Sequence, residues 1–205
     1  MTFLTQQQHT EIAAAIRAAE ARTTGEIVTV IAAESDSYFW PAMFAAALIA
    51  FVVPGVVAPF IGLVSSGDLF FIQLATLLAL QIPLLVPRFR AALIPPSIRR
   101  DRARRRAREQ FVERGLHLTQ DRTGVLIFVS IAERYVEILA DAGIDSKVDQ
   151  AAWQQIVDKF VSDVRSDRVA NGFRIAIQKV GEILAEHFPA GAKNPDELPN
   201  RLYVI

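Results

Sequence analysis

Two long uncharged segments constrain this chain more than any other feature. Trp40 to Val64 is 25 residues without a charge, and Leu69 to Pro87 is another 19, whereas about 20 apolar residues are needed to span roughly 30 Å of hydrocarbon. Only Ser65 to Asp68 separates them, so two spanning helices joined there must run antiparallel. The sequence therefore predicts a transmembrane helical hairpin at residues 38–87, with spans at 40–64 and 69–87. The alternative is a helical hairpin buried in a soluble core.

Arginine is concentrated directly after the second uncharged segment. Nine of the 22 basic residues lie between Arg88 and Arg108, while the short loop between the spans carries only Asp68. Because cytoplasmic flanks of membrane spans are enriched in lysine and arginine, this asymmetry predicts a two-span inner-membrane protein. Both termini and the folded part are then expected in the cytoplasm, and the polar opening of the chain, which does not have the pattern of a secretory signal, agrees.

The arginine-rich segment has three interpretations: a topology signal, a surface for anionic lipid, and a nucleic-acid patch. Its position beside a span favours topology, with contact to lipid headgroups accompanying it. Nucleic acid is not expected, because no stacking aromatic residues interleave with the arginines. The expected partners are membrane lipids and an unidentified membrane or cytoplasmic protein. The residues expected to face lipid headgroups are Arg99, Arg100, Arg102, Arg104, Arg105, Arg106 and Arg108.

The residues on either side of the hairpin have the pattern of a water-soluble α/β domain. Runs that are apolar on both faces predict buried strands, and apolar residues at helical spacing predict amphipathic helices. Thr5 and Gln8 are spaced as a capping box, and Gly25 suits a left-handed turn that ends the first helix. Strands are expected at 26–33, 123–131 and 135–140, helices at 5–24, 98–114, 149–164 and from 166 or 167 to 188, and the loop-like tail offers a short edge strand at 201–205.

The order of these elements predicts the fold class α/β: a small α/β/α sandwich with a mixed sheet of three to four strands, interrupted by the transmembrane hairpin. Right-handed crossover makes the first two strands parallel, and the third then runs antiparallel. The expected division is 1–37 for the first part of the domain, 38–87 for the hairpin, 88–189 for the basic helix and the remainder, and 190–205 for the tail. This connectivity gathers at one end of the sheet Gly25, Glu26, Asp121, Thr123, Asp141 and Asp145.

Several segments resemble the TPM domain family. They are TTGEIVTVIAA in the first strand, TGVLIFVSIAERYVEILADAGI in the strand hairpin and its turn, and the helical WQQIV and VANGFRIAI. The resemblance covers residues 5–36 and 99–189, with the two spans as an insertion after the first strand, and bacterial membrane members of this kind look similar to the whole chain. It implies an α/β/α sandwich and, as in some relatives, acid phosphatase activity or divalent-cation binding. Relatives commonly have Gly-Leu-Glu and a downstream Thr-Asp where this chain has Gly143-Ile144-Asp145 and Lys147-Val148-Asp149.

Carboxylates at four-residue intervals form the candidate metal site. Asp141, Asp145 and Asp149 fall in one turn, and Glu26 is placed near them across the end of the sheet. Carboxylate oxygens are the ligands that Ca²⁺ and Mg²⁺ prefer, so either ion is a candidate cofactor. In the alternative interpretation Asp149 caps a helix and the other carboxylates are solvated in a turn.

Other catalytic machinery is not indicated. The chain has no cysteine, which excludes thiolate catalysis and cysteine-ligated metals. The three histidines are far apart in sequence, and no glycine-rich phosphate loop is present. Two functional hypotheses remain: a membrane-anchored accessory, scaffold or assembly factor, and a divalent-cation-dependent, acid phosphatase-like hydrolase that uses the acidic turn.

Overall fold

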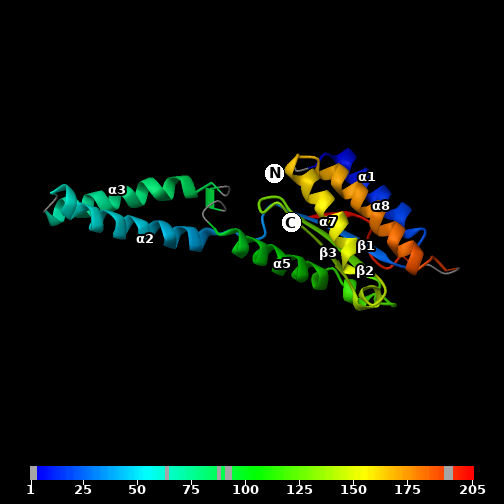
Figure 1. Ribbon diagram of the computed structural model, residues 1–205. Helices are drawn as coiled ribbons and strands as arrows, with labels where there is room; N and C mark the ends of the chain where they lie inside the picture. Colours follow the sequence, from blue (N-terminus) through cyan, green and yellow to red (C-terminus); the bar gives the residue numbers. More distant parts are fainter. Residues whose placement is uncertain (1–3, 63–64, 87–88, 91–93, 192–195) are drawn as a thin grey trace. The chain divides into compact units, whose positions relative to one another are not determined.

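The computed structural model describes residues 4–62, 65–86, 89–90, 94–191 and 196–205. The chain divides into two compact units. The first, here called the α/β unit, comprises residues 1–35 and 100–205, and the second, the hairpin unit, comprises residues 36–99. Figure 1 labels the helices and strands of both.

A four-stranded mixed sheet forms the centre of the α/β unit. Its strands are β1 (Glu26–Ala32), β2 (Gly124–Ser130), β3 (Tyr135–Ala140) and β4 (Leu202–Val204), in the spatial order β3-β2-β1-β4. β1 pairs in parallel with β2 and with β4, and β2 pairs with β3 in antiparallel orientation. The strand directions and the edge strand predicted from the sequence are therefore confirmed, and β3 and β4 are the two edges.

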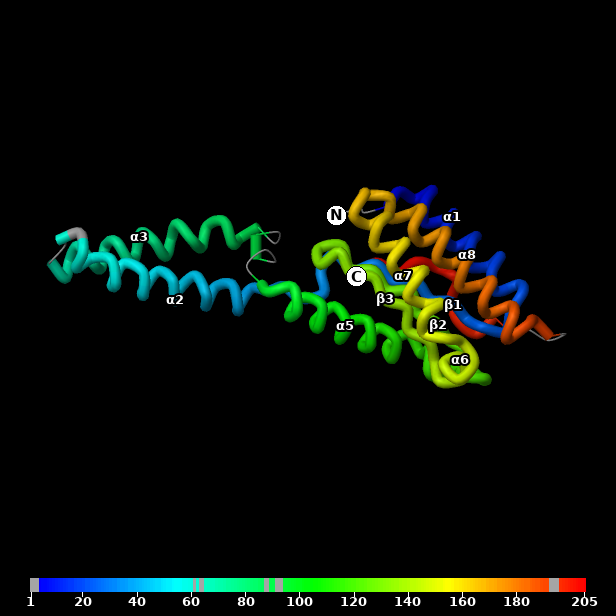
Figure 2. Tube along the Cα trace, viewed as in Figure 1, coloured from blue at the N-terminus to red at the C-terminus, as the bar shows by residue number. Residues whose placement is uncertain are grey.

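Helices cover both faces of the sheet (Figure 2). One layer contains α1 (Gln6–Glu20), α7 (Gln150–Arg165) and α8 (Val169–His187), and the opposite face carries α5 (Pro96–Glu113). Every residue of β1 and β2 is buried, as expected for strands that pack against helices on both sides. The predicted α/β/α sandwich is therefore the observed architecture.

Local sequence signals explain where the helices begin and end. The amide of Gln8 donates to Thr5 Oγ1 at 3.2 Å and the amide of Thr5 donates to Gln8 Oε1 at 2.7 Å, so the predicted capping box is confirmed. Gly115 has a φ of 72° directly after α5, which is a conformation that favours glycine. Two short helices were not predicted: α6 (Ala142–Asp145) lies where a turn was expected, and η2 (Leu116–Leu118) lies in the connection between α5 and β2.

The predicted role of Gly25 is wrong. α1 already ends at Glu20, and the described glycines with positive φ are Gly62 and Gly115. Gly25 instead lies against α8, where an added Cβ would come within 2.9 Å of Leu184 Cδ1. Close approach of the chain to α8, and not a left-handed turn, explains the glycine.

The hairpin unit contains α2 (Phe39–Val57), η1 (Ala58–Ile61) and α3 (Ser66–Leu84). α2 buries a stripe of small residues at four-residue intervals, Ala42, Ala46 and Ala50, followed by Pro54, whereas its large apolar side chains are exposed. The side-chain amide of Gln73 in α3 donates to the carbonyl of Phe51 at 3.1 Å. Both helices are long and apolar enough to cross a membrane.

Candidate functional site

The end of the sheet where β1 and β2 begin gathers residues from distant parts of the chain. The amide of Glu26 donates to the carbonyl of Thr123 at 3.1 Å, and the amide of Asp141 donates to the carbonyl of Gly124 at 2.9 Å. Glu26, Thr123 and Asp141 therefore lie at the same end of the sheet, as the predicted connectivity requires.

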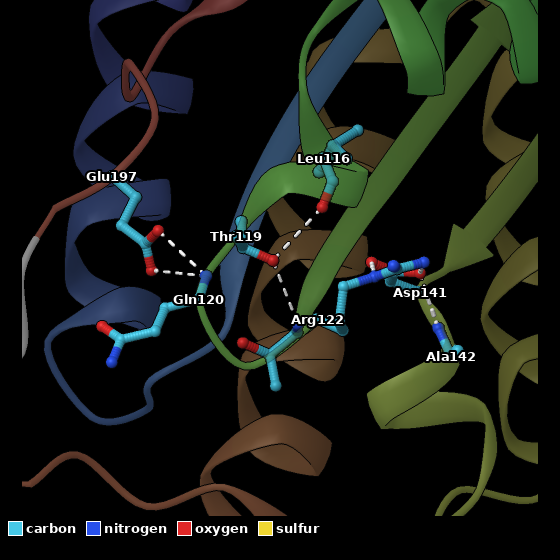
Figure 3. A network of polar contacts seen from close by, with 8 residues as sticks. Leu116, Thr119, Gln120, Arg122, Asp141, Ala142 and Glu197 are labelled. Atoms are coloured by element: carbon cyan, nitrogen blue, oxygen red, sulfur yellow. Dashed lines mark hydrogen bonds and ion pairs between the residues drawn. The ribbon is translucent and has the colours of Figure 1, made fainter.

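Asp141 is engaged by a neighbouring arginine (Figure 3). Arg122 donates from Nε to Asp141 Oδ2 at 2.5 Å and from a terminal nitrogen to Oδ1 at 2.9 Å. Oδ1 also accepts from the amide of Ala142 at 2.7 Å, so Asp141 caps α6. The guanidinium of Arg122 lowers the pKa of Asp141 below its ordinary value. Asp141 is therefore an ionised carboxylate whose two oxygens already accept three hydrogen bonds.

The other two carboxylates of the predicted acidic turn lie at the surface. Asp145 is exposed in α6, and Asp149 is exposed at the start of α7, where its Oδ1 accepts from the amide of Ala151 at 3.1 Å. This is the helix-capping geometry of the alternative interpretation. A metal-binding role for Asp141, Asp145, Asp149 and Glu26 stays a prediction.

A different set of carboxylates comes together around Glu26. Within the described ranges, Glu20, Glu26 and Asp196 each offer a carboxylate oxygen, and these oxygens lie within 4.8 Å of one another. They come from the last turn of α1, the first residue of β1 and the tail before β4. We call these three residues the acidic cluster. Its oxygen ligands and its spacing are of the kind that a divalent cation accepts.

Backbone amides tie the acidic cluster to the sheet and to the tail. The amide of Ile27 donates to Glu20 Oε1 at 2.7 Å, and the amides of Glu197 and Leu198 donate to the carboxylate of Glu26 at 3.3 and 3.1 Å. Glu197 Oε2 also accepts a hydrogen bond from the amide of Gln120 at 3.1 Å (Figure 3). These contacts hold the tail beside the start of β1 and so place Asp196 at the cluster.

Burial determines the protonation of the acidic cluster. Glu20 and Glu26 are buried, whereas Asp196 is exposed. The pKa of Glu20 is raised to about 8: burial is the main cause, the amide of Ile27 opposes it, and the nearby carboxylates of Glu26 and Asp196 add to the rise. The pKa of Glu26 is also raised, again mainly by burial. Glu20 therefore holds a proton near neutral pH, and a cation bound at the cluster would compete with that proton.

Sequence reasoning selected Glu26 but missed Glu20 and Asp196. Glu20 was one polar residue in an amphipathic helix, and Asp196 belonged to a tail interpreted as loop. One signal was available: Glu20 lies in the last turn of α1, where the helix dipole disfavours an acidic side chain. Its position six residues before Glu26, across a short turn, predicts two neighbouring carboxylates.

The predicted basic residues lie on α5. Ala103 and Ala107 are buried against the sheet, and the arginines that alternate with them are exposed or half-buried. Arg104 lies 3.7 Å from the carboxylate of Glu137 in β3, and Arg105 pairs with Glu109 at 3.0 Å. The structure thus places the arginines around the narrow apolar face of α5, and their contact with lipid stays a prediction.

Comparisons with known proteins bear on the family and the fold. Residues 90–183 match the family model TPM_phosphatase, described as the TPM domain. No curated protein matches. A solved structure, the NMR structure of BA42 protein from the psychrophilic bacterium Bizionia argentinensis, superposes with a TM-score of 0.63 at 21% identity, covering 99% of this chain and 96% of that one. Such a likeness shows the fold. The segment that is similar to the TPM domain, residues 90–183, includes α5, β2, β3, α6 and α7.

Proposed function

We propose that this chain is a membrane-anchored TPM domain that acts as an accessory or scaffold factor for another protein. One observation carries the anchoring: the hairpin unit exposes its large apolar side chains, such as Trp40, Phe44 and Phe60, while it buries alanines. In water this arrangement costs free energy at every exposed ring. In a bilayer the same side chains are solvated by lipid, and close helix packing through small residues is the common mode of association.

The proposed orientation places both termini and the α/β unit on the cytoplasmic side of the inner membrane. The basic segment after α3 supports this orientation, since positive charge is retained on the cytoplasmic side. The opposite end of α3 has the acidic Asp68 in its first turn. The arginines of α5 are then near anionic headgroups, where each contributes about 1 kcal/mol.

Because the chain has no cysteine, single introduced cysteines report its topology without interference. Gly67→Cys marks the turn between the spans, and Gln178→Cys marks an exposed position of α8. A membrane-impermeant maleimide added to spheroplasts should label the first variant, and should label the second only after the membrane is opened. Recovery of the intact chain in the aqueous fraction without detergent would contradict the anchoring, and the reverse labelling pattern would contradict the orientation.

A second candidate function is a divalent-cation-dependent hydrolase of phosphomonoesters. The acidic cluster favours it, because three carboxylates near one another can bind Ca²⁺ or Mg²⁺. The predicted turn at Asp141, Asp145 and Asp149 is a competing location for the same ion. A cation bound at either location would act as a Lewis acid on a phosphate oxygen of the substrate.

Paired variants of the full chain in detergent separate these locations. The wild type, Glu20→Gln and Asp141→Asn are each titrated with Ca²⁺ or Mg²⁺. Calorimetry measures cation binding, and hydrolysis of a generic phosphomonoester measures turnover. Loss of cation binding in Glu20→Gln alone assigns the ion to the acidic cluster, and loss in Asp141→Asn alone assigns it to the turn. Neither binding nor turnover in the wild type would discard the hydrolase.

A further inference from the structure

The edge strand β3 has backbone groups available for another strand. In an antiparallel pair, alternate residues form hydrogen bonds with the neighbouring strand. Because the amide of Asp141 donates to the carbonyl of Gly124 in β2, the residues of β3 whose backbone groups point toward β2 are Tyr135, Glu137 and Leu139. The amides and carbonyls of Val136, Ile138 and Ala140 then point away from the sheet. Among the residues that the structure describes, none forms a hydrogen bond with these outward-pointing groups, which makes β3 an open edge.

This open edge is recessed between two helices. A groove of about 600 Å³ runs along the whole of β3, with α5 on one side and α7 on the other, and Figure 1 shows β3 between these helices. Six residues of extended chain cover about 20 Å, which is the length of β3. The walls leave space for one extended segment, whereas the edge of another sheet would bring its own covering helices against α5 and α7.

Charge is unevenly distributed along the groove. Arg104 lies beside Glu137 near the start of β3, Arg134 directly precedes β3, and Arg100 is one turn earlier on α5. α7 returns from the end of β3, so Arg165 at its last residue lies at the same end as these three arginines. At the other end the groove is lined by Asp145, and the carboxylates of Glu137 and Asp158 line it between the two ends.

An unsatisfied donor lies in the wall of the groove. Trp153 is only 2% exposed and lines the groove, and its indole Nε1 has no acceptor among the residues that the structure describes. A buried donor without an acceptor costs about 1–3 kcal/mol. Because this nitrogen is itself buried, a carbonyl of a segment in the groove can accept from it only if the indole ring shifts toward the groove.

We propose that the groove along β3 binds an extended segment of a partner protein, which adds to the sheet as a further strand. The segment carries acidic residues at the end that meets Arg100, Arg104, Arg134 and Arg165. Backbone hydrogen bonds to Val136, Ile138 and Ala140 supply the affinity, and the arginines fix the direction of the segment. This inference rests on the accessory role proposed above and names the class of partner.

Peptide binding to the full chain in detergent tests the proposal. The probe is a fluorescent peptide with two acidic residues followed by six alternating valine and threonine residues, measured by fluorescence anisotropy. Two control peptides carry lysines in place of the acidic residues, or N-methyl groups on alternate amides, which remove the donors that a new strand needs. The acidic peptide should bind, and each control should bind at least about tenfold more weakly.

Matched variants on the protein complete the test. Arg100→Glu with Arg165→Glu should weaken binding of the acidic peptide at least about tenfold. Arg105→Glu is the control, because Arg105 is on α5 but does not line the groove. Circular dichroism verifies the fold of each variant, and since all the changes are on exposed side chains, folding should be retained.

The proposal is overturned by no binding of the acidic peptide, by equal binding of the N-methylated peptide, or by equal effects of the groove and control variants. Concentration-dependent self-association abolished by Arg165→Glu would assign the groove to a second copy of this chain and also overturn it. Failure of the membrane anchoring is seen separately in the labelling experiment, and it leaves the peptide measurement valid.

Discussion

The two units of this chain place the same kinds of side chain in opposite positions. Phe128 and Phe173 of the α/β unit are 0% exposed, whereas Phe60 and Trp40 of the hairpin unit are 86% and 78% exposed. In the α/β unit large apolar side chains fill the interior, as the hydrophobic effect requires in water. In the hairpin unit the buried residues of α2 are three alanines and Pro54, and most of the large apolar side chains of α2 and α3 are exposed. The two units therefore pack differently, and the difference is the one that the proposed membrane anchoring requires.

The contrast extends to the polar groups. Buried carboxylates of the α/β unit accept hydrogen bonds or ion pairs, for example Asp163 with Lys159 and Arg168. α2 has no charged residue at all, and α3 has only Asp68, in its first turn. Paired charges at the edge of a water-soluble core keep contact with water, whereas placing a charged side chain in the centre of a bilayer has a large free-energy cost.

The largest expected effect comes from matched truncations in the two units. Phe128→Ala should lower the free energy of unfolding of the α/β unit by about 3–5 kcal/mol, because it leaves a cavity in the sheet core. Phe60→Ala, at an exposed ring, should change it by less than about 0.5 kcal/mol. Each unit has one tryptophan, Trp40 and Trp153, so denaturation followed by fluorescence in a Trp40→Phe background reports the α/β unit alone.

Equal losses from these two truncations would show that Phe60 is also buried in the native protein. The hairpin would then be a covered element of a soluble core, which is the alternative interpretation of its sequence. The comparison between the units would fail with it.

A charge introduced on the exposed face of α2 should have the next largest effect, on the free energy of membrane insertion. Leu48 is 55% exposed near the middle of α2, and Leu48→Arg should make membrane insertion less favourable by about 3–4 kcal/mol. Gln178→Arg places the same residue on an exposed face of α8 and should leave insertion and folding unchanged. Extraction of membranes at alkaline pH measures the inserted fraction of each variant, and equal inserted fractions would contradict a lipid-facing α2.

Local patterns were sufficient to predict most of the fold. The capping box at Thr5 and Gln8 depends on a few neighbouring residues. The strand directions follow from crossover rules once the elements are identified. For the same reason the sequence placed Glu26, Thr123 and Asp141 at one end of the sheet.

The candidate sites depend on distant parts of the chain, and this is where sequence reasoning fell short. Glu20 and Asp196 are separated by most of the sequence, and they meet only because amides of the tail bind Glu26. Arg122 was not assigned to Asp141, since pairing across the start of β2 and the end of β3 requires the register. The groove along β3 likewise depends on sheet order, because β4 adds beside β1 and leaves β3 as an edge.

The smallest expected effect is the pH dependence of the free energy of unfolding, and it concerns only the α/β unit. The pKa of Glu20 is about 8 in the folded protein against an ordinary 4.5, so the folded state keeps a proton that the unfolded state has lost between these values. The free energy of unfolding should therefore be greatest at or below pH 4.5 as far as this group is concerned. It should fall by at most about 1.4 kcal/mol per pH unit as the pH rises toward 8.

Glu20→Gln is the matched control, since its amide oxygen can still accept from Ile27 but does not titrate. Denaturant unfolding at several pH values should give a clearly shallower slope for this variant, and the slope that remains reports Glu26, whose pKa is also raised. Trp153 should show the pH dependence, whereas the hairpin unit, which lacks the acidic cluster, should not follow it. Parallel pH profiles for the wild type and Glu20→Gln would mean that Glu20 is ionised in the folded protein at neutral pH. If Ca²⁺ restores stability at pH 8 in the wild type alone, the cation and the proton compete for the same carboxylates.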